Sequence, residues 1–368
     1  MWLQEPNRGE RIVFSLGFAS GGFRNYSSPQ WGTFPALWNV LDWGSNPMPG
    51  GFRVNRRRAL LAGSAALQSG LLGKAEAQVV APVTVRLPIA PRLQWEELDG
   101  YCGECCIQQA ALFFGTYVSQ YVCRAIINPN QKSQLLVGVN EQTVLSALRL
   151  GSVAFDYSKV PSPQFPSYLV WVKQHLSLRR PVLITAYVRG LKDPDYDHIM
   201  LATGFAAGDT VKYNPADQLA FNDCLHPLVF NRAAASLSDT RRMRGNGARY
   251  EFCLPANICY GCAVTGIQDS SLLALPVQIS MATGYEPDLM AGAAPVLLNG
   301  TVTVSGLVPG KSYCLYRYND HRIVPTANYA KSSYSSALKF VAPVASVAFP
   351  VTIPSNGVAV FRCLPAGK

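Results

Sequence analysis

The sequence has few charged residues, few histidines and no long apolar run. Only 15% of its 368 residues are charged and four are histidine, whereas 49% are hydrophobic. This composition is typical of a folded globular chain and excludes an intrinsically disordered one. The longest unbroken apolar stretches are of strand length, short of the roughly 18 to 20 residues that a membrane-spanning helix requires. The length suffices for two domains, each with its own core.

Two kinds of binding motif are also missing. The sequence contains no glycine-rich phosphate cradle, so we expect no nucleotide and no other cofactor. It contains no stripe of interleaved basic and aromatic residues, which argues against a nucleic acid partner. The one dense basic run, over residues 241–244, is interpreted as a solvated loop. Beyond residue 77 there are 24 basic and 18 acidic residues, a mild excess of +6.

The segment over residues 48–77 has the form of a secretory signal peptide. Arginines at 56–58 precede an apolar run over residues 59–72, and Ala75-Glu76-Ala77 matches a small-x-small cleavage site. The arginines partly match a twin-arginine signal. Residues 1–47 are then either a long leader or the product of a start codon placed too early. We therefore predict export to the periplasm or the extracellular space; the alternative is an ordinary surface helix over residues 59–72.

The cysteine content is consistent with export. Ten cysteines suit an oxidising compartment in which disulfides form, and Cys314 and Cys363 are predicted to pair because they stand alone in the C-terminal region. Cys102-Gly103-Glu104-Cys105 and Cys259-Tyr260-Gly261-Cys262 are both C-x-x-C motifs, and their four thiolates could hold zinc. The motifs lie 154 residues apart, whereas zinc ribbons usually bring them within about 15 to 20. We therefore expect no metal.

The most informative stretch begins at Cys102. A Cys-Gly step there leads into a helix-like run, and the N-terminus of a helix favours the thiolate, which is the form that attacks a carbonyl carbon. Further along, His198 opens a strand-like run and can supply the base that such a thiol needs. The remaining histidines are poorer bases by position: His175 on a helix, His226 before a proline and His321 in the C-terminal region.

Hydrophobic periodicity predicts an α+β fold. Helical spacing indicates helices over residues 140–148 and 166–176. Apolar runs indicate strands, over residues 182–188, 199–205, 209–214 and 218–222. A helical half carries Cys102 and a sheet half carries His198.

These features resemble the papain-like cysteine peptidases, and within them the C39-like branch. Gln94, the Gly100-Tyr101-Cys102-Gly103-Glu104 segment and the Asp197-His198-Ile199 segment occur in that order, and the resemblance covers roughly residues 88–265. It implies a papain-like helical half and an antiparallel β half in a domain over residues 78–269. It also implies hydrolysis of peptide bonds through an acyl-enzyme intermediate.

The resemblance gives the candidate residues their roles. Cys102 would be the nucleophile and His198 its base. Gln94 would bind the tetrahedral oxygen together with the Cys102 backbone amide, although its spacing of eight residues exceeds the family's usual six or so. Glu104 replaces the small residue common in the family. A carboxylate there would raise the pKa of the thiol unless its side chain points to solvent.

The residue that orients the imidazole is left open between two positions. Asn214 lies sixteen residues after His198, at the spacing expected for the next strand of a hairpin. Asn222 and Asp223 end a better strand, and a longer hairpin loop would bring them to the same place. We divide the assignment between Asn214 and Asp223.

Residues 270–368 are predicted to form an all-β sandwich domain. Runs over residues 301–307 and 313–318 alternate apolar with polar across a Pro-Gly turn. The Gly-Leu-x-Pro-Gly-x-x-Tyr string that begins at Gly306 is similar to fibronectin type III modules. The alternative is a β extension continuous with the enzyme core.

The sequence thus predicts an exported cysteine peptidase that acts on a peptide or protein substrate. It would use a Cys-His-Asn/Asp triad and have no stable membrane span after signal removal. Two alternatives stay open. One is a non-catalytic binding protein on a papain-like scaffold. The other is transfer of the acyl group to an amine, as in transglutaminases, which shares the acyl-enzyme step.

Overall fold

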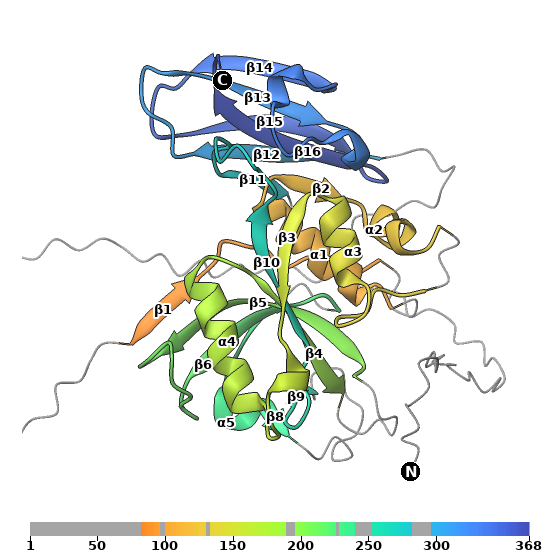
Figure 1. Ribbon diagram of the computed structural model, residues 1–368, viewed down its shortest axis with the longest axis vertical. Coiled ribbons are helices and arrows are strands. Elements are labelled where there is room, and N and C mark those ends of the chain that lie inside the picture. The colour runs from red at the N-terminus through yellow and green to blue at the C-terminus, as the bar shows by residue number, and fades with distance from the viewer. Residues whose placement is uncertain are drawn as a thin grey trace, which may run out of the picture. The chain divides into compact units, whose positions relative to one another are not determined.

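The structure is a computed structural model (Figure 1). It describes residues 82–95, 100–129, 133–188, 196–225, 228–239, 252–281 and 296–367. All of them belong to one compact unit, which spans residues 75–368. The predicted leader and signal peptide, His226 and the basic run over residues 241–244 lie outside the described residues. Among the described helices, none has the length and apolarity needed to cross a membrane.

A nine-stranded sheet forms the centre of the fold. Its main path runs in the order β3 (Leu150–Ala154), β10 (Gly261–Ile267), β4 (Val182–Val188), β5 (His198–Ala207), β6 (Gln218–Asp223) and β7 (Leu228–Ala233). Three short strands join it, namely β1 (Val83–Arg86) on β5, β9 (Phe252–Pro255) on β4, and β8 (Ser238–Asp239) on β9. Only the β8–β9 pairing is parallel among those described. The fold is therefore mixed α+β and rich in antiparallel strands.

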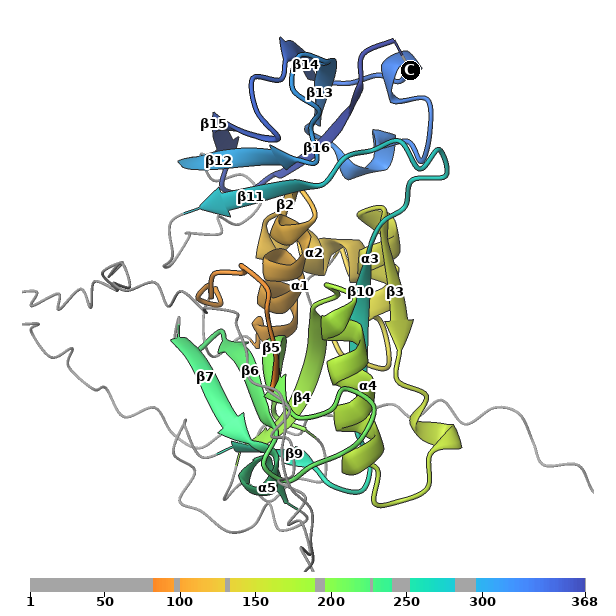
Figure 2. The same ribbon diagram turned by 90° about the vertical axis from the view of Figure 1, so that its left-hand side faces the viewer.

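Helices pack against this sheet and share its apolar core. They are α1 (Cys102–Phe113), α2 (Gln120–Ile127), α3 (Glu141–Ala147), α4 (Phe165–Ser177) and the short α5 (Ala234–Leu237). Ile107 of α1, Val172 of α4 and Leu201 of β5 are fully or almost fully buried in one cluster. Both α1 and α4 contact β5, and α1 ends against the C-terminal strands (Figure 2). The core therefore fixes the start of α1 relative to β5.

Most of the predicted elements are confirmed, and one strand is wrong. The helices predicted over residues 140–148 and 166–176 are α3 and α4, and three of the four predicted strands are β4, β5 and β6. Residues 209–214 form no strand. The Lys173 ammonium instead holds the backbone of this segment by donating to the carbonyl oxygens of Asp209 at 2.7 Å and Lys212 at 2.6 Å.

The C-terminal residues form two further sheets that share an apolar cluster. One has the order β11 (Val277–Met281), β12 (Leu297–Ser305) and β15 (Ser346–Pro354); the other has β14 (Ser336–Val341), β13 (Ser312–Tyr318), β16 (Val358–Pro365) and β2 (Thr116–Val118). Val304 and Phe361 meet in the cluster between them. β2 follows α1 in the sequence and pairs with β16, so a strand from the N-terminal half of the described chain completes a C-terminal sheet.

Candidate active site

Cys102 is the first residue of α1 and is partly exposed, unlike the other nine cysteines, which are buried. The first amide N–H groups of a helix have no acceptor within the helix, and the helix dipole adds partial positive charge at this end. Both effects favour negative charge on or near the Cys102 sulfur. The start of α1 therefore suits a nucleophilic thiolate and the oxyanion that its attack creates.

Gly103 allows α1 to begin close to β5. A β-carbon at this position would lie 2.5 Å from a Leu135 side-chain carbon and 3.0 Å from Ile199 Cδ1. Such distances are shorter than van der Waals contact, so a larger residue would push the helix start away from the strand that carries His198. Glycine after Cys102 is therefore explained by packing, because α1 and β5 approach each other too closely there for a side chain.

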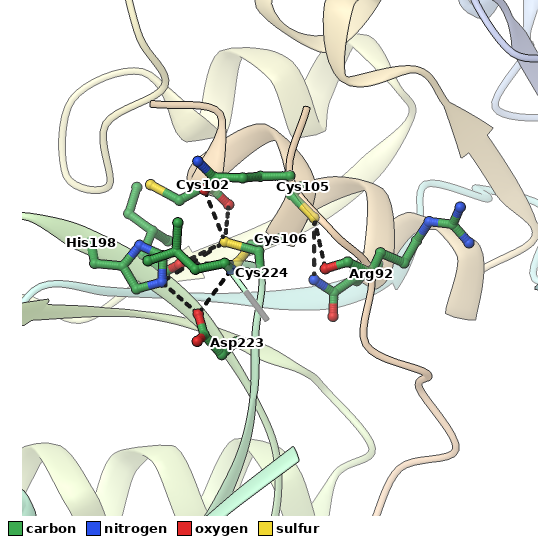
Figure 3. A network of polar contacts seen from close by, with 11 residues as sticks. Arg92, Cys102, Cys105, Cys106, His198, Asp223 and Cys224 are labelled. Carbon is green, nitrogen blue, oxygen red and sulfur yellow. Dashed lines mark hydrogen bonds and ion pairs between the residues drawn. The ribbon is translucent and has the colours of Figure 1, made fainter. Parts of the chain in front are cut away.

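His198 is the first residue of β5, and its ring lies between Cys102 and Asp223 (Figure 3). Nε2 lies 2.8 Å from Asp223 Oδ1, in a pair with side-chain exposures of 7% and 2%. With Nε2 engaged by the carboxylate, Nδ1 is the ring nitrogen left for the thiol. The arrangement is that of a nucleophile, a base and a group that orients the base.

The interactions of His198 raise its pKa. Burial by itself lowers the pKa of the imidazole, but hydrogen bonds to Asp223 and to Cys102, together with their negative charge, outweigh burial and raise the pKa to about 9. The imidazole therefore carries a proton at neutral pH. A protonated His198 can stabilise the Cys102 thiolate and later give its proton to a leaving group.

Strand pairing selects Asp223 over the other two candidates. Leu201 of β5 pairs with Asn222 of β6. Continuing this antiparallel register places Asp223 opposite Met200, two residues along β5 from His198. Asn222 points to the other face, as successive residues of a strand do, and donates to Gln109 Oε1 at 2.9 Å.

Asn214 is not brought to the ring. It precedes Gln218, which pairs with Ala206, and Ala206 lies eight residues along β5 from His198. At about 3.3 Å per residue this is a separation of roughly 25 Å along the strand. Asn214 instead closes a turn, in which its Oδ1 accepts from the Ala216 amide at 2.9 Å.

Gln94 lies at the site with its side chain buried. Its backbone amide donates to the Cys224 carbonyl oxygen at 2.8 Å, and its Oε1 lies 3.4 Å from Cys224 Sγ. Cys224 Sγ is in turn 3.8 Å from the Cys102 carbonyl oxygen. The spacing of eight residues to Cys102 therefore does not keep Gln94 away, because both residues contact Cys224.

Glu104 points neither to solvent nor to the thiol. Its carboxylate pairs with Arg124 at 2.8 Å and accepts from the Leu135 amide at 3.1 Å. Burial raises the pKa of Glu104 against the lowering effect of Arg124. The pair joins α1 to α2, and the guanidinium neutralises the charge that would otherwise act on Cys102.

Three buried cysteines behind the site were not predicted to belong to it. Their sulfurs donate to backbone carbonyl oxygens, Cys105 to Arg92 at 3.4 Å and both Cys106 and Cys224 to Ile199, at 3.5 and 3.7 Å. Burial raises the pKa of all three thiols, to about 11 for Cys106. They therefore stay protonated at neutral pH. The sequence signal for Cys224 is its position directly after Asp223.

Aromatic side chains flank the thiol. Tyr196 donates to the Val137 carbonyl oxygen at 3.2 Å. Burial raises the pKa of Tyr196, and negative charge on Cys102 raises it further. Its ring lies 5.9 Å from that of Tyr260, which lies 4.8 Å from that of Tyr157. These three rings form a continuous apolar wall, of which Tyr196 is the member that interacts with Cys102.

The four thiolates of the two C-x-x-C motifs are not brought together in the described residues. Cys259 Sγ donates to the Pro255 carbonyl oxygen at 3.0 Å, and no group of metal-binding side chains there combines Cys259 or Cys262 with Cys102 or Cys105.

The strand register also separates Cys314 from Cys363. Cys314 pairs with Leu364 and Leu315 pairs with Cys363, so the two sulfurs leave opposite faces of the sheet. Both cysteines are free, and the bond proposed between them is not made.

No protein-family model and no curated protein matches this chain.

The pKa of His198 leads to a test of Asp223 that needs no substrate. The pKa of His198 is about 9 in the folded protein and near 6.5 in the unfolded chain. Protonation of His198 therefore stabilises the fold fully below pH 6.5, and this stabilisation is lost as the pH rises to about 9. We expect the free energy of unfolding to fall by roughly 3 kcal/mol across this window, measured by urea denaturation.

Asp223→Asn should flatten this dependence because it removes the carboxylate that holds the proton. Asn214→Ala is the matched control, since Asn214 bonds only locally. It should keep the wild-type slope. The same slope in Asp223→Asn and wild type would contradict the assignment.

Proposed function

We propose that this protein is a papain-like cysteine hydrolase that cleaves amide bonds of peptides or proteins. The observation that carries the proposal is the position of His198, between Asp223 on one side and a thiol at a helix N-terminus on the other. Asp223 and Cys102 are the two neighbours of the ring, and each has a side chain suited to its proposed role. The carboxylate fixes the ring, and the partly exposed sulfur can reach a substrate.

The arrangement supports a two-step reaction. Cys102 Sγ attacks the substrate carbonyl carbon as a thiolate, while the imidazolium of His198 holds the proton. His198 then gives this proton to the leaving amine, which leaves an acyl-enzyme on Cys102. In the second step His198 accepts a proton from water while the water oxygen attacks the acyl carbon, the bond to Cys102 Sγ breaks, and the acid is released with the thiolate and the imidazolium restored. Asp223 keeps Nε2 protonated throughout.

The oxyanion would be stabilised by groups at the start of α1. The Cys102 backbone N–H has no acceptor within the helix, so it is available to the tetrahedral oxygen. Gln94 is the side-chain candidate for a second donor because it is buried beside Cys224 and the Cys102 carbonyl. The tyrosine wall favours substrates with apolar or aromatic side chains near the scissile bond.

We further propose that the enzyme is exported and carries a C-terminal β-sandwich module. The shared cluster between the two C-terminal sheets supports a sandwich, in which inward residues of both sheets form one core. The basic, apolar and small-residue succession over residues 48–77 supports export. Such a module would bind or position the substrate.

The test of the function is turnover of a blocked peptide amide with a chromogenic leaving group, under reducing conditions. We expect release of the leaving group by the wild type and none by Cys102→Ala. Cys123→Ala serves as the control, since Cys123 is buried away from the triad in the core. An added amine that appears in the product would identify acyl transfer. Absence of turnover and of any covalent intermediate would instead support a binding protein.

A further inference from the structure

Three donors of different chemistry converge behind the imidazole. They are Nε2 of His198, a carboxylate oxygen of Asp223 and Sγ of Cys224, and all of these atoms lie within 4.8 Å of one another (Figure 3). The three residues are buried, with exposures of 6%, 1% and 0%. A neutral imidazole, a carboxylate and a thiolate are the ligand types that zinc takes in proteins. The proposed triad uses His198 and Asp223 but not the thiol of Cys224.

The spacing of the donors is close to that of a zinc site. Zinc bonds of about 2.0 Å to nitrogen and oxygen and 2.3 Å to sulfur imply tetrahedral edges of about 3.3 Å between N and O and about 3.6 Å between N and S. The present distances are 2.8 Å from Nε2 to Asp223 Oδ1 and 3.9 Å from Nε2 to Cys224 Sγ. These two edges therefore differ from those of a zinc site by about half an ångström or less, and the edge from the carboxylate oxygen to Cys224 Sγ is within 4.8 Å.

We propose that His198, Asp223 and Cys224 form a zinc site that inhibits the enzyme. The ion would take these three ligands and leave its fourth position to water, as in sites with three protein ligands. When zinc binds, the Cys224 thiol and Nε2 of the His198 imidazolium must each lose a proton to the buffer. Hard cations such as Mg²⁺ and Ca²⁺ prefer sets of oxygen ligands and should not compete. This donor set differs from the four-thiolate set of the two C-x-x-C motifs.

The inhibition rests on the proposed function, whereas metal binding does not. Zinc on Nε2 removes the hydrogen bond to Asp223 and uses the lone pair of that nitrogen. The zinc-bound imidazole is neutral and its single proton is on Nδ1, facing Cys102. Giving up this proton would leave an imidazolate, so His198 can no longer pass a proton to the leaving amine or take one from water. Cys102 itself is not a ligand in this arrangement, and loading the site switches the base off without touching the nucleophile.

Zinc binding is measured first, on the full chain kept reduced with a phosphine. Titration with zinc chloride against a chromophoric chelator should show one high-affinity zinc per chain. Cys224→Ala should weaken this binding at least about tenfold. Cys106→Ala is the matched control because Cys106 is an equally buried neighbouring thiol whose sulfur contacts the Ile199 carbonyl oxygen. It should retain binding, as should Cys102→Ala.

Two results would overturn the site. One is a wild type that binds no zinc. The other is binding that is lost in Cys102→Ala but kept in Cys224→Ala, because the metal would then lie on the nucleophile. Asp223→Asn replaces Cys224→Ala if the latter does not fold. Modification of Cys102 by an electrophile, with and without zinc, separates the two proposals. If Cys102 is not modified even in the absence of zinc, the result contradicts the proposed function alone. If Cys102 is modified at the same rate with and without zinc, the result contradicts the inhibition.

Discussion

Replacement of His198 by alanine is expected to slow covalent modification of Cys102 by a peptide electrophile about 10²- to 10⁴-fold near neutral pH. The raised pKa of His198 means that the wild-type imidazole is charged at this pH and stabilises the thiolate next to it. Alanine removes both this positive charge and the hydrogen-bond donor that faces the sulfur. The rate is measured by intact mass as a function of time.

His175→Ala is the control for this experiment. His175 lies on α4, where its ring packs against Trp171 at 4.5 Å, and burial lowers its pKa, so it is neutral near pH 7. Its replacement should leave the rate of modification unchanged. Equal rates in His198→Ala and wild type would mean that the thiol and the imidazole are not coupled.

Replacement of Lys173 by methionine is expected to destabilise the protein by about 3 to 5 kcal/mol. The Lys173 ammonium is fully buried and lies 2.6 Å from Asp217 Oδ2. It also holds the two carbonyl oxygens of the 209–212 loop. Methionine fills the same space but leaves a buried carboxylate and these carbonyls without the cation. The free energy of unfolding is measured by urea denaturation.

An exposed pair provides the comparison. Lys159 lies 2.6 Å from Asp156, the same distance, but the two side chains are 81% and 47% exposed. Lys159→Met should therefore change stability too little to measure. Adding Asp217→Leu to Lys173→Met should recover part of the loss, because it removes the uncompensated charge. Equal small effects at Lys173 and Lys159 would show that burial does not strengthen this pair.

The longest apolar and periodic segments were the most predictable. Residues 182–188 form β4 because all of their side chains except Thr185 are apolar, as a strand buried on both faces requires. Residues 209–214 are apolar only at Val211 and Tyr213, and there the bonds from the distant Lys173 hold a loop. Local pattern cannot reveal a bond to a residue 36 positions away.

The pairing of the site residues depended on strand register. Spacing along the chain left Asn214 and Asp223 as alternatives because loop length between β5 and β6 was unknown; the register then placed Asp223 by the ring. In the same way, the effect of Glu104 depended on Arg124, which lies twenty residues later. Residue types identified the chemistry, and tertiary pairing selected the partners.

The most direct test of the account is the location of a single covalent adduct. The reduced wild-type protein is incubated near neutral pH with an irreversible peptide electrophile, digested and mapped by mass spectrometry. We predict one adduct per chain, on Cys102, while the buried Cys105, Cys106 and Cys224 stay unmodified. An adduct spread over several cysteines, or one that spares Cys102, would contradict the claim that the structure activates this thiol.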